Sequence, residues 1–120
     1  RMVAAQSTGC APVVKAFQRR ENKTEFWENS ETVALGLNVP GPIGGYWILR
    51  ILYESNGIAV DVPESDLQNL TDEFNSITRI NAGPEAGVVW GAFQKLRNVG
   101  WIDNSQSVVL FATGIERCKL

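Results

Sequence analysis

Short apolar runs alternate with amphipathic segments along the chain, and this alternation constrains the fold more than any other feature. The apolar runs are typical of strands and lie at residues 2–5, 32–39, 58–62 and 107–114, and residues 78–82 are a weaker strand candidate. Continuously apolar strands that are separated by helices are typical of a parallel sheet covered on both faces. The sequence therefore predicts an α/β fold with a mostly parallel sheet of about four to five strands and helices on both faces.

Four segments between these runs have helical start and stop signals. Pro12, Pro42 and Pro84 suit helix starts, where a missing N–H costs little. Ser65 followed by Gln68 is a capping-box pattern. The helical segments are "PVVKAFQRR", "IGGYWILRILYESNG", which ends at Asn56-Gly57, "DLQNLTDEFNSI" and "EAGVVWGAFQKLRNVG". In the second helix the expected inward positions are Trp47, Ile48, Ile51 and Leu52.

Length, charge and composition exclude several classes of function. The 120 residues are enough for one domain, so we expect a single α/β unit over residues 1–120. A net charge of −2 gives no attraction to nucleic acid or anionic lipid, and no apolar stretch is long enough for a membrane helix. The absence of histidine removes the usual general base and His-type metal sites, so we expect no metal. Two cysteines without metal spacing, together with no visible export signal, favour the cytoplasm.

Thr113 is the sharpest candidate for a functional residue. It follows the apolar run at residues 108–111 and precedes Gly114. In α/β proteins, ligands bind at the carboxyl ends of strands. A strand-end hydroxyl also bonds local backbone in many proteins, and the pattern alone leaves both interpretations open.

The other candidates are better explained by structural roles. Gly41, Gly44 and Gly45 match no phosphate-loop spacing and favour a tight loop into a closely packed helix. Glu85 in a first helical turn is explained by the helix dipole. Cys10 has no histidine to activate it, so we expect a packed or partly exposed thiol. The lysines are in polar surroundings and we expect them to be solvated; they are Lys15, Lys23, Lys95 and Lys119.

Four strings, in this order, resemble the carboxyl-terminal part of threonine synthase and its relatives, the fold-type-II enzymes that use pyridoxal phosphate. They are "AAQSTGCAPVVKAF", "WENSETVALGLNVPGPIGGYWILRILYESNGIAVDV", "NAGPEAGVVWGAFQKL" and "VVLFATG". The resemblance covers nearly the whole chain and implies part of the large domain of that fold. It implies a pyridoxal-phosphate-dependent carbon–oxygen lyase that converts O-phosphohomoserine, an amino-acid substrate, to threonine and phosphate.

The resemblance also implies a partial cofactor site. Thr113 and Gly114 match a Thr-Gly pair whose hydroxyl faces the pyridine nitrogen in that family. Ala34 and Gly36 match a strand end near the cofactor. The resemblance implies no catalytic residue in this chain, because the cofactor's lysine, the asparagine facing its hydroxyl and the phosphate loop all precede this region in the family.

Some positions depart from the family pattern. A second glycine and Leu-Lys usually follow the Thr-Gly pair, whereas this chain has "IERCKL". Gly45 stands where the family often has an acidic residue. We therefore expect a carboxyl-terminal fragment that is inactive alone and that self-associates or pairs with the missing amino-terminal part. The alternatives are a non-catalytic interaction module and a small-ligand-binding domain derived from the same fold.

Overall fold

A parallel pair of strands forms the centre of the protein. The computed structural model describes residues 1–115. Strand β1, Val3–Ser7, pairs with β2, Ile58–Val62, in the register that sets Val3 opposite Ile58 and Ser7 opposite Val62. The bounds of β2 are those expected from "IAVDV", and the parallel pairing confirms the predicted α/β class.

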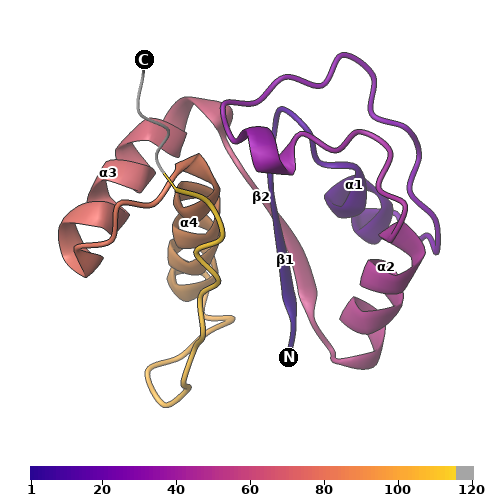
Figure 1. Ribbon diagram of the computed structural model, residues 1–120. Helices are drawn as coiled ribbons and strands as arrows, with labels where there is room; N and C mark the ends of the chain where they lie inside the picture. Colours follow the sequence, from indigo (N-terminus) through magenta and orange to yellow (C-terminus); the bar gives the residue numbers. More distant parts are fainter. Residues whose placement is uncertain (116–120) are drawn as a thin grey trace.

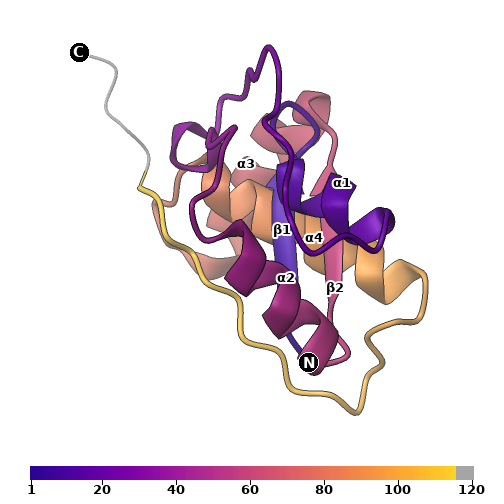
Figure 2. The same ribbon diagram turned by 90° about the vertical axis from the view of Figure 1, so that its right-hand side faces the viewer.

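Helices cover both faces of this sheet, as the alternating pattern predicted. Figure 1 shows α1 and α2 on one side of the strands and α4 on the other, with α3 packed against α4, and in Figure 2 α1 and α2 lie in front of the strands with α4 behind them. The helices are α1 (Pro12–Gln18), α2 (Gly45–Glu54), α3 (Leu67–Thr78) and α4 (Pro84–Asn98), with the short 3-10 helices η1 (Leu35–Leu37) and η2 (Glu64–Asp66). None of these helices is long and apolar enough to cross a membrane.

The strands contribute alternate side chains to two separate apolar clusters. Val60 and Val62 face α4, where they pack with Val88, Ala92 and Leu96. On the other face Ala59 packs with buried residues of α1 and α2, which are Val13, Val14, Ala16, Leu49 and Leu52. Burying a side chain of this kind stabilises the fold by about 1.5–3 kcal/mol. Both faces are therefore held by apolar burial.

The predicted sheet of four to five strands is wrong for the described residues, where the sheet has two. Residues 32–39 contain η1 instead of a strand, because Leu37 N–H bonds the Ala34 carbonyl and Val33 N–H bonds the Glu64 carboxylate. Residues 78–82 and 107–114 are also not strands. Their only ladder contact in residues 1–115 is an isolated antiparallel bridge between Ala82 and Ile115.

The buried-strand prediction for residues 108–111 is likewise wrong. Val109 is 78% exposed and Phe111 is 69% exposed. The segment follows the molecular surface in an extended path (Figure 1). Its apolar sequence is that of a central strand, yet no strand among residues 1–115 pairs with it.

Two helix predictions also need correction. Helix α2 buries Gly45, Leu49 and Leu52 and leaves exposed three of the four expected inward residues, namely Trp47, Ile48 and Ile51. The capping box does not form, since the Ser65 hydroxyl donates to Asp66 and the Gln68 amide to Asp72. The stop of α2 is confirmed, because Asn56, two residues after the last helical residue Glu54, has a positive φ of 51°.

Candidate functional site

A cleft of about 380 Å³ lies where η1, the start of α4 and the carboxyl-terminal segment meet. Six residues line it: Gly36, Leu37, Glu85, Thr113, Gly114 and Ile115. They come from three stretches that are far apart in the sequence, and the fold alone brings them together. Glu85 is the one ionisable side chain among the six.

Glu85 connects two walls of this cleft. Its Oε1 accepts a hydrogen bond from the Gly36 N–H at 2.9 Å. The residue lies in the first turn of α4, just after Pro84, where the helix dipole favours a carboxylate. The predicted dipole role is therefore compatible with the structure. The contact with η1 was not foreseen, although the Pro84-Glu85 pair lies in one of the strings that resemble the family.

Glycines allow the backbone to approach the Glu85 carboxylate closely. A Cβ atom on Gly36 would lie 3.0 Å from Glu85 Oε1, and one on Gly83 would lie 2.8 Å from Oε2. A Cβ atom on Gly114 would overlap Oε2. Larger residues at these positions would push the carboxylate or the backbone aside, so the cleft requires the small residues that the sequence has there.

The carboxyl-terminal segment is anchored beside α4 by backbone contacts. Gly83 N–H donates to the Gly114 carbonyl at 3.1 Å, and Ala82 forms its isolated bridge with Ile115. These contacts place Thr113 at the cleft with its side chain exposed. Within residues 1–115 the structure shows no hydrogen bond from the Thr113 hydroxyl.

Three of the four residues that the resemblance implied as cofactor-binding lie together, and one does not. Thr113, Gly114 and Gly36 line the cleft. Ala34 is fully buried in the apolar cluster on the α4 face, where its side chain packs with the core.

A second polar cluster lies at the carboxyl ends of the two strands and fixes the loop before η1. Glu64 accepts hydrogen bonds from the buried Ser7 hydroxyl and from Val33 N–H, the latter at 2.6 Å. Burial raises the pKa of Glu64, but the hydrogen bonds from Ser7, Val33 and Thr32 together lower it below its ordinary value. These polar groups are satisfied within the protein, so the cluster has a structural role.

The remaining sequence candidates lie away from the cleft. Cys10 is fully buried, which confirms the packed thiol, and burial raises its pKa although Val39 N–H opposes the shift. Lys15 pairs with Glu25 at 2.8 Å and Lys95 with Asp61 at 3.4 Å.

The other lysines and the glycine-rich loop also give no ligand site at the cleft. Lys23 is exposed, and Lys119 lies outside the described residues. A Cβ atom on Gly45 would lie 2.7 Å from Thr24 Oγ1, which supports close helix packing over phosphate binding. The chemistry available at the cleft is therefore one carboxylate, one hydroxyl and backbone groups.

Comparisons with known proteins agree with the family resemblance. No protein-family model matches the chain. Threonine synthase of Methanocaldococcus jannaschii is 25% identical over 114 residues, and that of Methanosarcina acetivorans is 26% identical over 114 residues. Each match covers 95% of this chain but 28% of the relative, so the chain spans little more than a quarter of their length. The chain is thus similar to a part of threonine synthase, as the motifs predicted.

Proposed function

We propose that the chain is the carboxyl-terminal part of a threonine-synthase-like catalytic domain and supplies one wall of its cofactor site. The observation that carries this proposal is the cleft in which Thr113, Gly114 and Gly36 meet around Glu85. Three residues that the resemblance assigned to the cofactor come from two distant segments, and they line one cavity.

The residues present fit one edge of pyridoxal phosphate. The Thr113 hydroxyl lines the cleft and would face the ring nitrogen, and the backbone of Gly36 and Gly114 lines the same cleft. When bound, this cofactor supplies an electron sink for reactions at the α and β carbons of an amino acid. A neutral hydroxyl as the partner of the ring nitrogen leaves that nitrogen unprotonated, so the ring withdraws electrons less strongly.

The described residues do not fit the rest of the cofactor. No lysine lines the cleft, and Lys15 and Lys95 are engaged in ion pairs elsewhere. The covalent lysine and the phosphate-binding loop would come from the complementary portion of the enzyme. The chain alone is then inactive, and the whole enzyme would convert O-phosphohomoserine to threonine and phosphate.

Glu85 would act as a positioning residue. Its carboxylate accepts from the Gly36 N–H and packs beside Gly114, so it would hold these two walls of the cleft in place. Replacing it would widen the cleft and weaken cofactor binding without removing the Thr113 hydroxyl.

The test uses a chimera in which this chain replaces the matched 114 residues of the Methanosarcina acetivorans threonine synthase. We expect the chimera to bind pyridoxal phosphate with a saturable absorbance change, and the isolated chain to show neither this change nor a lysine trapped by borohydride. Thr113→Val should shift the absorbance of the bound cofactor, and Thr113→Ser, which keeps the hydroxyl, should restore it. A Thr113→Val chimera with an unchanged spectrum would rule out the assigned wall, as would stoichiometric trapping of Lys15, Lys23, Lys95 or Lys119 in the isolated chain.

A further inference from the structure

Strand β1 has a free edge. Its Met2 carbonyl accepts from Ile58 N–H at 3.1 Å, and Thr8 N–H donates to the Val62 carbonyl at 2.9 Å, both toward β2. Backbone groups of successive residues in a strand point to opposite edges. The N–H and C=O groups of Val3 and Ala5 therefore point away from β2, and the two-stranded sheet gives them no partner in residues 1–115.

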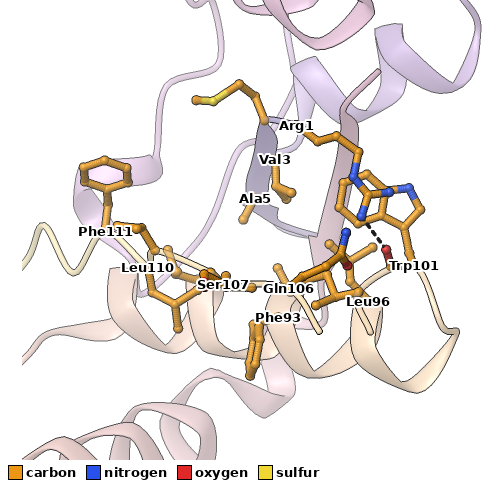
Figure 3. A pocket seen from close by; sticks show the side chains of 16 residues that line it. Arg1, Val3, Ala5, Phe93, Leu96, Trp101, Gln106, Ser107, Leu110 and Phe111 are labelled. Carbon is orange, nitrogen blue, oxygen red and sulfur yellow. Dashed lines mark hydrogen bonds between the residues drawn. The ribbon is translucent and has the colours of Figure 1, made fainter. Parts of the chain in front are cut away.

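An apolar cavity of about 450 Å³ lies along this free edge. Val3 and Ala5 form one side, α4 contributes Phe93 and Leu96, and the segment at residues 106–111 closes the opposite side (Figure 3). Arg1 is the one charged residue of the lining, and its guanidinium lies over the Trp101 ring at 3.7 Å from the centroid. The cavity thus favours an uncharged, apolar occupant.

The segment opposite β1 is also unpaired. Between residues 107 and 112 no backbone group forms a backbone–backbone hydrogen bond within residues 1–115. The segment runs in the same direction as β1 in Figure 1 and lies on the side of β1 away from β2 in Figure 2. Two extended stretches with unpaired backbone therefore border one apolar cavity.

We propose that an apolar segment of about five residues occupies this cavity as a β-strand between β1 and residues 107–111. The length matches β1, which has 5 residues. The occupant would come from the nearly three quarters of the threonine synthases that the match leaves out, so its source rests on the proposed function. It would satisfy the backbone of Val3 and Ala5 and cover the exposed Val108 and Phe111.

Neither β1 nor β2 of a second copy fits this cavity. A strand placed there needs two free edges, one for β1 and one for residues 107–111. In a second copy β1 and β2 are already paired with each other, so each offers one free edge. The geometry thus favours a strand supplied by the complementary portion over pairing of two sheets.

Amide hydrogen exchange of the isolated chain provides the first test. Ala4 and Gln6 face β2 and should exchange slowly, whereas Val3 and Ala5 should exchange at least tenfold faster. Slow exchange of Val3 and Ala5 in dilute monomer would mean that the chain covers its own edge, and this would overturn the proposal. If exchange at Val3 and Ala5 becomes slower as the protein concentration rises, the occupant is a second copy, and this result would also overturn the proposal.

The same amides are then compared in the chimera with the Methanosarcina acetivorans enzyme. We expect Val3 and Ala5 to slow at least tenfold, to the level of Ala4 and Gln6. If the chimera binds the cofactor but Val3 and Ala5 still exchange fast, the strand is wrong and the proposed function stands. Protected Val3 and Ala5 without cofactor binding would support the strand and contradict the proposed function.

A pair of variants keeps the test independent of the folding of the chimera. The isolated chain is mixed with the separately expressed remainder of the same enzyme. Val108→Asp places a charge in the cavity lining, and Val99→Asp places one at an exposed position after α4. We expect Val108→Asp to weaken association at least tenfold relative to Val99→Asp. Equal affinities, or no association of the parent chain, would overturn the proposal.

Discussion

The β2 strand and the carboxyl-terminal segment have similar apolar sequences but opposite environments. In "IAVDV" the side chains of Ala59, Val60 and Val62 are buried, and the backbone pairs with β1. In "VVLF" the side chains of Val109 and Phe111 are largely exposed, and the backbone is unpaired in residues 1–115. Apolar character therefore indicates what a segment can bury, and the neighbours on both sides decide whether it does so.

The two regions are also held by different forces. The sheet is stabilised by apolar clusters on both faces, whereas the final segment depends on the packing of Leu110 against the cluster of Phe74, Ala82 and Ala86 and on a few contacts at one end, near Gly83 and Glu85. Substitutions should therefore have large global effects in the first region and small or local effects in the second.

A charge placed in each region should give the largest contrast. Val60→Asp puts a carboxylate in a side-chain position that is 5% exposed, and we expect a loss of at least about 4 kcal/mol in the free energy of unfolding. Val109→Asp, at a position that is 78% exposed, should change it by less than about 0.5 kcal/mol. Urea unfolding followed by tryptophan fluorescence measures both. Comparable losses would mean that residues 108–111 are buried after all.

Gly114→Ala tests the anchor of the final segment. The new Cβ atom would overlap Glu85 Oε2 and should weaken the anchor by about 1–3 kcal/mol. We expect faster amide exchange at Gly83, whose N–H bonds the Gly114 carbonyl, with little change at Ala59. Adding Glu85→Ala should restore part of the protection, because the overlap is then removed. Strictly additive effects of the two substitutions would show that the overlap is not the cause.

We expect the smallest effect on stability from the titration of Glu64, which accepts hydrogen bonds from Ser7 and from Val33 in the loop before η1. Because the folded-state pKa of Glu64 lies below its ordinary value of 4.5, its contribution is fully present above that value. The contribution is lost as the pH falls through the lower folded-state pKa. Glu64→Gln should therefore flatten the decline of stability below pH 4.5, measured by urea unfolding at several pH values. An unchanged slope would show that Glu64 makes no such contribution.

The sequence predicted best those elements whose partners lie within the described residues. Strand β2, the α/β class and the helix starts at Pro12 and Pro84 were all predicted correctly, because the proline and period signals are local. The strands expected at residues 32–39, 78–82 and 107–114 were not, because no local signal tells whether a neighbouring strand is in place. In the same way, no local signal tells that the Trp47 face of α2 has no covering partner within the described residues.

The cleft was predictable in part and for a different reason. Thr113 was a candidate from its position after an apolar run, Gly114 and Gly36 were identified through a family resemblance, and the fold brings the three together. The side chain of Ala34 lies in the core and not in the cleft, because residues two positions apart in a short motif can face different surroundings. Glu85 was assigned to the helix dipole alone, since a contact over 49 positions leaves no periodic trace in a sequence.

The contacts of Glu85 have a consequence for the order of events during synthesis. Its carboxylate joins backbone from residue 36 to backbone from residue 114, and proteins fold from the amino-terminal side as they emerge from the ribosome. The β1–β2 pair needs only residues up to Val62, so it can form while translation continues. The cleft cannot close until residue 114 has emerged, and nascent chains stalled before that point would have a sheet but no cleft.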